Sequence, residues 1–488
     1  MVDRNSIHCR GIRSHFAPIF ADRKLKMGVD GPSNSGLNGE RTKIPKGDGV
    51  MGEEMDHNSD QKSDRLVSAA PYGLLVLLTV INTLNFVDRN LLASFANYIK
   101  PELNLTDTQY GLLTGLVFLL FYAVAGLFMG MLADLSNRPK LIAGAIAVWS
   151  VMTAISGAAR GFVSLAIPRS LIGIGESALT PSAMSLLADR FSSARLGLVA
   201  AIYYTGVPIG TGAGLLLAGY LGPAIGWRNC FYALGALGLV LSLLMLTVHE
   251  PRKVPVRHPG TGLGFGAQIA QLMIALRRSK ALVATMCGGV ALHFAVGAAQ
   301  FDQLWFVVER GFEKGEIARL SGYVTVAAGL AGNLFGGIVG DWWQRHMKTG
   351  RPMMLFWMML AILPLSIGFR LVEPGTLIFN IGLGIGVFQL AAFYGPTFST
   401  VQELASKDSR ATVTGFYILC LNCIGMGVGV TGAGWAVDQF RQAGFAEPYT
   451  AANLLAIGLS TLALPAFFLA GLWSKADRAK IDAQEAAA

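Results

Sequence analysis

Four ionisable residues interrupt two of the most apolar stretches of this 488-residue chain. Asp88 and Arg89 follow Asn85 in one stretch, and Arg169 and Glu176 occupy another. A charge at the centre of a membrane helix costs about 2.5–3.5 kcal/mol, so each of these side chains is expected to face a partner or a cavity. Burial disfavours a charged carboxylate, so Asp88 could bind a proton near neutral pH. Arginine stays charged and suits a phosphate or a carboxylate.

Helix geometry restricts which of these residues can meet. Arg169 and Glu176 are two turns apart, so they share a face but lie about 10 Å from each other and cannot pair directly. Asp88 and Arg89 diverge by about 100° around their helix, so they need not neutralise each other. Two simpler interpretations stay open. Asp88 and Arg89 would then end a span at the water interface, and Arg169 and Glu176 would form ion pairs that stabilise the fold.

The composition indicates that these residues lie on membrane helices. Hydrophobic residues make up 53% of the chain and charged residues only 14%, against about 25% charged in soluble proteins. Twelve spans of about 22 residues need roughly 260 residues, which fits the length. This balance excludes a disordered chain, a disulfide-stapled secreted fold and a soluble multidomain enzyme. The 59 glycines favour closely packed helices over a barrel, so we predict an all-α membrane protein.

Apolar runs separated by short polar turns occur in two groups of six. They cover residues 70–98, 108–132, 139–159, 162–187, 197–222, 229–248, 281–308, 318–340, 352–371, 375–402, 410–437 and 450–473. We predict a disordered cytoplasmic tail (1–68), an N-terminal six-helix half (69–248), a cytoplasmic linker (249–280), a C-terminal six-helix half (281–473) and a cytoplasmic C-terminal tail (474–488). The linker segment Phe265–Leu276 is expected to form a short surface helix.

The distribution of Lys and Arg predicts the orientation. With both termini inside, fifteen of these residues fall in cytoplasmic connections and eight on the opposite side, which favours an inner-membrane protein with cytoplasmic termini. The net charge of +9 lacks a basic, aromatic-interleaved patch, so no nucleic-acid partner is expected. Cys420 and Cys423 form an isolated CxxC, so we expect neither a metal nor a redox cofactor.

One turn recurs in both halves. Gly130-x-x-x-Asp134-x-x-x-Arg138 follows the second run, and the spacing returns with Asp341 and Arg345 after the eighth. The repeat implies two halves related by a pseudo-two-fold axis along the membrane normal, with the substrate path between them. We expect these residues to form a conformational latch whose pairing changes as the halves rock. The simpler interpretation is a solvated turn with ordinary charges.

The turn from Gly130 to Lys140 resembles the signature of the major facilitator superfamily, with Asn137 where many members have glycine. Asn85-Phe-Val-Asp-Arg89, Arg169-Ser-Leu-Ile-Gly-Ile-Gly-Glu176 and Gly206-Val-Pro-Ile-Gly210 together resemble its Spinster-like branch. This resemblance covers about residues 69–473. It implies proton-linked transport of amphiphilic lipids such as lysophospholipids or sphingoid phosphates. By that pattern Asp88 and Glu176 would carry protons, while Arg89, Arg169 and Asn85 would tune those carboxylates or hold a head group.

The C-terminal half offers polar and aromatic residues where the N-terminal half offers charge. The candidates for its side of a cavity are His293, Gln300, Trp305, Phe393, Tyr394 and Asn422. A cavity that is polar on one side and apolar-aromatic on the other suits a molecule with a charged head and a long tail. Such residues can also serve packing alone, and His293 can be a hydrogen-bonded core residue.

We therefore predict a proton-coupled secondary transporter that works by alternating access, with protons, an amphiphilic lipid and the bilayer as partners and a monomer as the functional unit. The first alternative is the same fold carrying a small organic anion between Arg89 and Arg169. A more distant alternative is a polytopic lipid-modifying enzyme, which would need a nucleophile or a His/Asp pair, whereas His293 stands unaccompanied. We expect no enzymatic activity and no cofactor beyond the proton gradient.

Overall fold

The computed structural model describes residues 57–192, 195–250, 265–347, 349–406 and 409–487. The chain divides into two units after Asp60, and of residues 1–60 only the start of the first helix is described. The described residues form helices joined by short turns, without a strand. The all-α prediction is confirmed.

The N-terminal half consists of nine helical segments that make six spans. Four spans are interrupted by one or two residues, at Phe95, at Gly115, at residues 177–178 and at Thr205, and α9 contains two spans. The segments are α1 (His57–Ser94), α2 (Ala96–Glu102), α3 (Asp107–Thr114), α4 (Leu116–Leu135), α5 (Arg138–Gly157), α6 (Phe162–Glu176), α7 (Leu179–Ala188), α8 (Leu196–Tyr204) and α9 (Gly206–Leu246).

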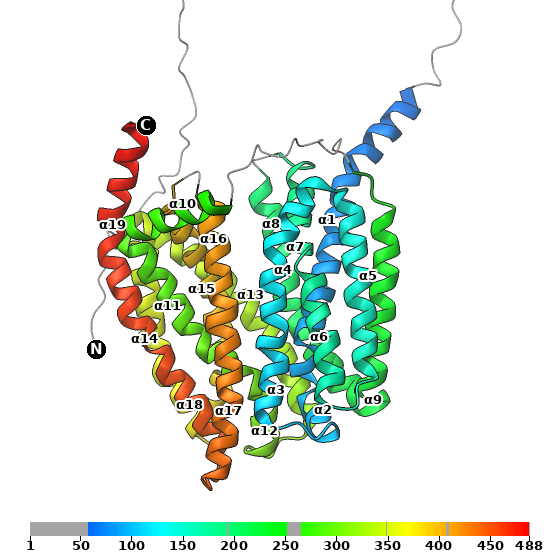
Figure 1. Ribbon diagram of the computed structural model, residues 1–488, viewed down its shortest axis with the longest axis vertical. Helices are drawn as coiled ribbons and strands as arrows, with labels where there is room; N and C mark the ends of the chain where they lie inside the picture. Colours follow the sequence, from blue (N-terminus) through cyan, green and yellow to red (C-terminus); the bar gives the residue numbers. More distant parts are fainter. Residues whose placement is uncertain (1–56, 193–194, 251–264, 348, 407–408, 488) are drawn as a thin grey trace, which may run out of the picture. The chain divides into compact units, whose positions relative to one another are not determined.

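The C-terminal half repeats this plan after the linker helix α10 (Phe265–Arg278). Its segments are α11 (Lys280–Ala298), η1 (Ala299–Phe301), α12 (Asp302–Val308), α13 (Lys314–His346), α14 (Gly350–Leu371), α15 (Leu377–Glu403), α16 (Arg410–Leu419), the π-helix η2 (Cys420–Gly427), α17 (Val428–Gln442), α18 (Pro448–Ser460) and α19 (Ala463–Ala487). Figure 1 shows the two halves side by side, with α10 lying across one end of the second.

Twelve spans result from eleven candidate membrane-crossing stretches among the described residues. The stretch Leu196–Leu246 is 51 residues long and contains two spans, because the chain kinks at Gly226 with φ of +77°. That φ is in the left-handed region, which glycine enters without a steric penalty. The predicted six-plus-six arrangement agrees with this count.

Two predicted tail boundaries differ from the structure. Residues 57–68 belong to helix α1, and residues 474–487 continue helix α19. Both segments carry polar helix formers without an interior proline, so each helix continues past its apolar run. The predicted surface helix in the linker is present as α10, whereas residues 1–56 and 251–264 lie outside the described part of the chain.

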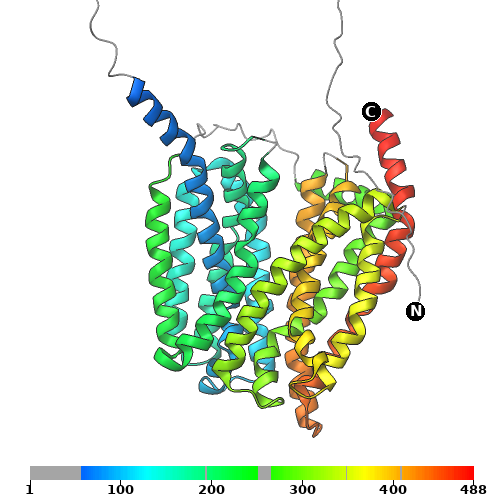
Figure 2. The ribbon, with the colours of Figure 1, turned by 180° about the vertical axis from the view of Figure 1, so that it is seen from behind.

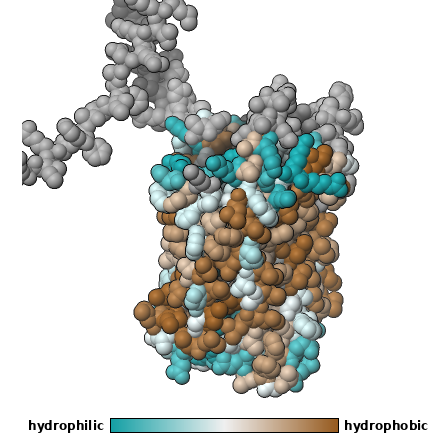
Figure 3. All heavy atoms as spheres, turned by 90° about the vertical axis from the view of Figure 1, so that its left-hand side faces the viewer, coloured by the Kyte–Doolittle hydropathy of each residue, from teal (hydrophilic) through white to brown (hydrophobic). Residues whose placement is uncertain are grey.

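The surface on the α14 and α19 side carries a broad apolar belt between two hydrophilic ends (Figure 3). Large apolar side chains are exposed within this belt, including Trp357 and Leu472. Such a surface suits the hydrocarbon core of a bilayer. We call the end where α1 begins and α19 finishes the termini end, and the opposite end the far end.

Glycines allow the two halves to touch through their backbones. A Cβ atom at Gly212 of α9 would lie 2.8 Å from the Gly322 carbonyl of α13, and one at Gly434 of α17 would lie 2.3 Å from the Asp107 carbonyl of α3. Figure 2 shows α13 leaning across toward the N-terminal half. Small residues at helix crossings are typical of membrane bundles. The close helix packing that the glycine content favoured is present at these two crossings.

The hydrophobic cores show where the halves are joined. The core of the N-terminal half continues into far-end residues of the second half, including Phe301, Trp305, Val430 and Tyr449. A separate core fills the remainder of the C-terminal half, around Phe393 and Tyr417. The molecule is therefore closed at the far end, where both halves share one core.

Candidate functional site

Helices α1 and α6 bring the four predicted charged residues into one buried cluster in the N-terminal half. Two glycines let α6 pack closely against α4 and α5. A Cβ at Gly173 would lie 2.6 Å from the Phe118 carbonyl of α4, and one at Gly175 would lie 3.3 Å from the Cβ of Trp149 on α5. Asp88, Arg169 and Glu176 are each 2–3% exposed. The structure thus places them inside the bundle, away from the water interface.

Arg89 and Glu176 form an ion pair in this cluster. The Arg89 Nε donates to Glu176 Oε2 over 3.2 Å, and the Arg89 side chain retains 18% exposure. The guanidinium also lies 4.4 Å from the ring centre of Tyr122 and 5.3 Å from that of Phe118. Cation–π contacts of this kind stabilise a partly desolvated arginine. Arg89 is therefore held between one carboxylate and an aromatic wall.

Arg169 contacts the backbone of α1. Its Nη1 and Nη2 atoms donate to the carbonyl oxygens of Asp88 and Arg89, each over 3.3 Å, and its guanidinium lies 4.9 Å from the ring centre of Phe118. These contacts fasten α6 to α1 at the two residues that carry charge. As the spacing predicted, Arg169 makes no hydrogen bond to Glu176 among the described contacts.

Asp88 is the least satisfied member of the cluster. Neither carboxylate oxygen has a hydrogen-bond partner among the described residues, and the second oxygen of Glu176 also lacks one. Asn85 is also buried, and its amide nitrogen is similarly unpartnered among the described residues. Buried polar atoms are nearly always satisfied. Three acceptor atoms without donors therefore mark a place where protons or a ligand can be accommodated.

Only some of the predicted C-terminal residues come together. The His293 ring nitrogens lie 2.8 Å from the Gly289 carbonyl and 3.2 Å from the Tyr394 hydroxyl, and the His293 ring packs against both Phe393 and Tyr394. His293, Phe393 and Tyr394 thus form one aromatic group within the C-terminal half.

The other three predicted residues lie apart from that group. Trp305 is fully buried and donates to Thr450 over 2.8 Å, with Arg370 4.5 Å from its ring centre. Gln300 contributes its carbonyl as the acceptor for the Tyr110 hydroxyl. The Asn422 amide donates to the Ile418 carbonyl of its own helix, where η2 begins. Trp305 and Gln300 thus contribute to closure at the far end.

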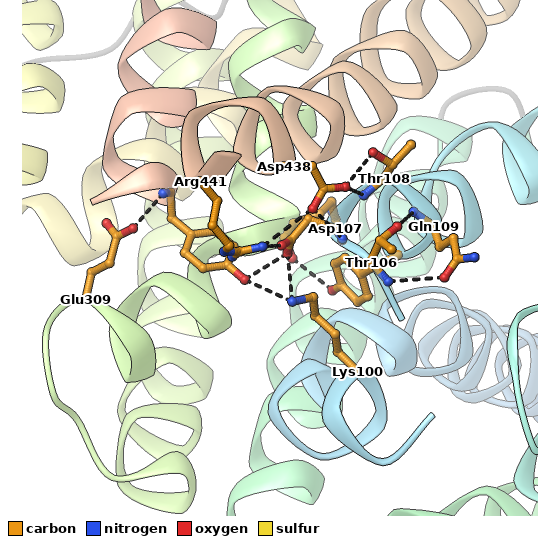
Figure 4. A network of polar contacts seen from close by, with 11 residues as sticks. Lys100, Thr106, Asp107, Thr108, Gln109, Glu309, Asp438 and Arg441 are labelled. Carbon is orange, nitrogen blue, oxygen red and sulfur yellow. Dashed lines mark hydrogen bonds and ion pairs between the residues drawn. The ribbon is translucent and has the colours of Figure 1, made fainter. Parts of the chain in front are cut away.

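A network of charges that the sequence analysis missed joins the halves at the far end (Figure 4). The carboxylate of Asp107 is fully buried. It accepts from the Tyr449 hydroxyl over 2.8 Å and pairs with Lys100 over 3.1 Å and with Arg441. Asp438 in turn accepts from the backbone and hydroxyl of Thr108. We call Lys100, Asp107, Asp438, Arg441 and Tyr449 the far-end network.

The sequence profile described as Major Facilitator Superfamily matches residues 78–430. The chain belongs to the Major Facilitator Superfamily. Among solved structures, a bacterial homologue of the human lysosomal transporter Spinster, inward-facing and unoccupied, superposes with a TM-score of 0.71 at 24% identity, covering 84% of this chain and 98% of that one. This likeness supports the fold.

Curated relatives place the chain on the Spinster-like side of the superfamily. An MFS-type efflux pump of Mycolicibacterium smegmatis is 29% identical over 73% of this chain and 82% of its own length. Protein spinster of Drosophila melanogaster is 24% identical over 74% of this chain, which spans 60% of that relative. The protein is a Spinster-like member of the superfamily, as its motifs indicated.

The superfamily turn at the termini end forms an ionic network within the N-terminal half. Arg138 is fully buried and pairs with Asp189 over 2.6 Å and with Glu250. It also donates to the Ser185 hydroxyl over 2.9 Å. These contacts connect the start of α5 to the ends of α7 and α9. The side chain of Asp134 lies outside the described part of the chain.

In the second half the aspartate of the recurring turn pairs with an arginine outside that turn. Asp341 pairs with Arg351 over 2.8 Å, and Arg351 also pairs with Glu403. Arg345 is exposed and donates only to the Asp341 carbonyl among the contacts described. Arg138 and Arg351 each precede a proline at the start of a helix. The shared Arg-Pro start, rather than the spacing from the aspartate, identifies the equivalent residues.

Replacing Arg351 with alanine is expected to destabilise the C-terminal half slightly, because Asp341 loses this partner while Glu403 keeps its pairing with Arg478. The Asp341 side chain is 53% exposed, so the loss costs about 1 kcal/mol or less, which should lower the apparent melting temperature in detergent by about one or two degrees. Arg345→Ala is the matched control and should leave that temperature unchanged. Equal effects of the two substitutions would contradict this assignment.

Proposed function

We propose that this protein is a proton-coupled secondary transporter that moves an amphiphile with an anionic head group, of the lysophospholipid or sphingoid phosphate type, by alternating access. The observation that carries the proposal is Arg89, a partly exposed arginine whose single carboxylate partner, Glu176, is itself otherwise unsatisfied. A relative from Danio rerio, 26% identical over 57% of this chain, is named a sphingosine-1-phosphate transporter. That name supports the substrate class.

Coupling between substrate and proton follows from competition for Arg89. A phosphate head group can form a bidentate contact with the guanidinium in place of the Glu176 carboxylate. Glu176 would then lose its cationic partner inside a buried site, where the charged form is disfavoured, and would take up a proton. Asp88, which lacks a donor, would be the second proton carrier. Substrate binding and protonation would thereby both act on the cluster of Asp88, Arg89 and Glu176.

The two faces of the site suit the two ends of an amphiphile. The N-terminal half offers Arg89 and Arg169 for a head group, and the C-terminal half offers Phe393 and Tyr394. An aliphatic chain gains about 0.8 kcal/mol for each CH₂ group that it buries. We therefore expect the chain length of the substrate to affect affinity strongly.

Alternating access follows from closure at the far end. The far-end network and the shared core join the halves there, so the site would open toward the termini end in this state. With the termini in the cytoplasm, as the Lys and Arg distribution predicts, this is the inward-facing state. Fusions of a reporter that is active only in the cytoplasm should give signal at both termini, and signal from the opposite compartment would contradict the inner-membrane orientation.

The decisive experiment uses the purified full chain in proteoliposomes with an imposed pH gradient. The panel contains lysophospholipids and sphingoid phosphates of several chain lengths, together with soluble organic anions of equal charge. We expect gradient-driven flux of the lipids that increases with chain length and collapses when a protonophore removes the gradient. Flux that does not respond to the gradient would refute proton coupling, and the appearance of a chemically altered lipid would indicate an enzyme.

A small organic anion is the second candidate. A relative from Bacillus subtilis, 24% identical over 80% of this chain, is named a hexuronate transporter. Arg89 and Arg169 could clamp a carboxylate equally well. Competition by soluble anions, without an effect of acyl-chain length, would favour this function over lipid transport.

A further inference from the structure

The ring of Phe118 on α4 contacts both arginines of the buried cluster. The guanidinium carbon of Arg89 lies 5.3 Å from the centre of this ring, and that of Arg169 lies 4.9 Å from it. Both distances are within about 6 Å, the range over which a cation is attracted to an aromatic ring. Since Arg89 belongs to α1 and Arg169 to α6, a ring from a third helix connects the two cations.

The backbone of Phe118 lies where α6 has no side chain. A Cβ atom at Gly173 would be 2.6 Å from the Phe118 carbonyl, closer than such contacts normally allow. Gly173 follows Arg169 by one helical turn and precedes Glu176 by another, so the three residues share one face of α6. Phe118 therefore packs against α6 at the level between its arginine and its carboxylate.

The Phe118 ring is also held in place by its own helix. It is 1% exposed and stacks on Tyr122, with ring centres 5.8 Å apart and planes inclined by 22°. Tyr122 in turn contacts the Arg89 guanidinium at 4.4 Å. A buried ring that is packed on several sides has little freedom to move. Phe118 is thus a rigid support for the two guanidiniums.

Both arginines need such a support, because two like charges repel each other strongly in a buried site. The carboxylate that pairs with Arg89 is Glu176, whereas Arg169 donates to the backbone carbonyls of α1 through its two Nη atoms. The Nε atom of Arg169 is buried without a hydrogen-bond partner among the described residues. Since buried donors are nearly always satisfied, this N–H indicates room for an anionic ligand.

We propose that Phe118 is a positioning residue whose ring holds Arg89 and Arg169 at the separation at which one phosphate head group contacts both. This inference rests on the proposed transport of an anionic amphiphile, and it assigns the preference for a phosphate to the spacing of the arginines. A phosphate monoester carries up to two negative charges and three acceptor oxygens, so it can engage two guanidiniums. A carboxylate is satisfied by one bidentate guanidinium, so it loses less when the two move apart.

The test replaces Phe118 with phenylalanines that carry one, two or three ring fluorines, introduced into the full chain by nonsense suppression. Fluorine nearly preserves the shape of the ring and withdraws the electron density that attracts a cation. The affinities of the protein in nanodiscs are measured for a long-chain alkyl phosphate and for a fatty acid of equal chain length. We expect the ratio of phosphate to carboxylate affinity to fall with each fluorine, by about tenfold with three. The maximal rate of counterflow should stay unchanged.

The same fluorinated series at Phe95 is the matched control. Phe95 is fully buried in the same half, and its ring packs against those of Tyr98 and Phe231. Both affinities should therefore stay at their wild-type values. A second comparison uses an Arg169→Gln background, in which one cation is left to hold. There the fluorines at residue 118 should change the affinity ratio by less than about twofold.

Three outcomes would overturn the proposal. Equal loss of affinity for both ligands would show that the Phe118 ring serves packing alone. Unchanged affinities across the fluorinated series would show that the ring does not hold the arginines. A fluorine effect that persists at full size in Arg169→Gln would show that it does not act through the pair. By contrast, a wild-type chain that binds neither amphiphile above the level of empty nanodiscs would refute the proposed function and this inference with it.

Discussion

Replacing Glu176 with glutamine, or Asp88 with asparagine, is expected to abolish proton-driven accumulation of substrate while the protein still folds. Each substitution preserves shape and removes a group that can titrate. In Glu176→Gln, Arg89 keeps its aromatic neighbours and loses its anionic partner, so an anionic head group no longer has to displace a carboxylate. We expect gradient-driven flux to fall to the level of liposomes without protein, because neither amide can carry a proton.

Two further measurements make this result specific. Counterflow of substrate at equal pH on both sides should persist in both variants, because it needs binding and rocking without net proton movement. Glu373→Gln, at an exposed carboxylate of the second half, is the matched control and should transport like wild type. If either site variant retained normal gradient-driven flux, its residue would not be a proton carrier.

The second large effect is expected at the far-end network. Asp107→Asn leaves Lys100 of the same half and Arg441 of the opposite half without the carboxylate that both contact. Breaking such a buried arrangement costs about 3–5 kcal/mol, which changes the ratio of closed to open far ends by a hundredfold or more. The population should therefore move toward the state that is open at the far end.

Distances between paired spin labels report this shift. Labels at Arg160 and Ala446, in a background without the native cysteines, lie on exposed far-end positions of opposite halves. Their distance distribution should lengthen in Asp107→Asn. Glu447→Gln removes a carboxylate that pairs with Arg310 within the second half alone, so it should leave the distribution unchanged. An unaltered distribution in Asp107→Asn would show that the network does not hold the far end closed.

The spacing of apolar runs was sufficient to predict the membrane spans, and the free-energy cost of burying a charge was sufficient to predict the charged cluster. Asp88, Arg89, Arg169 and Glu176 could be identified because a charge inside an apolar run needs a compensating environment wherever the helix finally packs. The capping function of Thr106 could be predicted equally well, since its capping box with Gln109 involves only neighbours in sequence.

Contacts between distant helices could not be predicted in this way. Asp107 follows a helix cap and would be taken for an ordinary first-turn acid, but its carboxylate pairs with Arg441, 334 residues later. The partners Phe118 and Tyr122 look like any aromatic pair on a membrane helix until Arg89 is placed over them. Among the residues that the sequence analysis missed, Arg351 could have been identified as the equivalent of Arg138, because both precede a proline at the start of a helix.

The far-end network has an electrical consequence. Lys100 and Asp107 belong to one half, and Asp438 and Arg441 to the other, so each half brings one positive and one negative charge to the closure. Separating them moves no net charge through the membrane field, which acts on each elementary charge with about 2.3 kcal/mol per 100 mV. Membrane voltage therefore does not change the free energy of this closure. Any voltage dependence of turnover must originate in the protons and the head group at the cluster of Asp88, Arg89, Arg169 and Glu176.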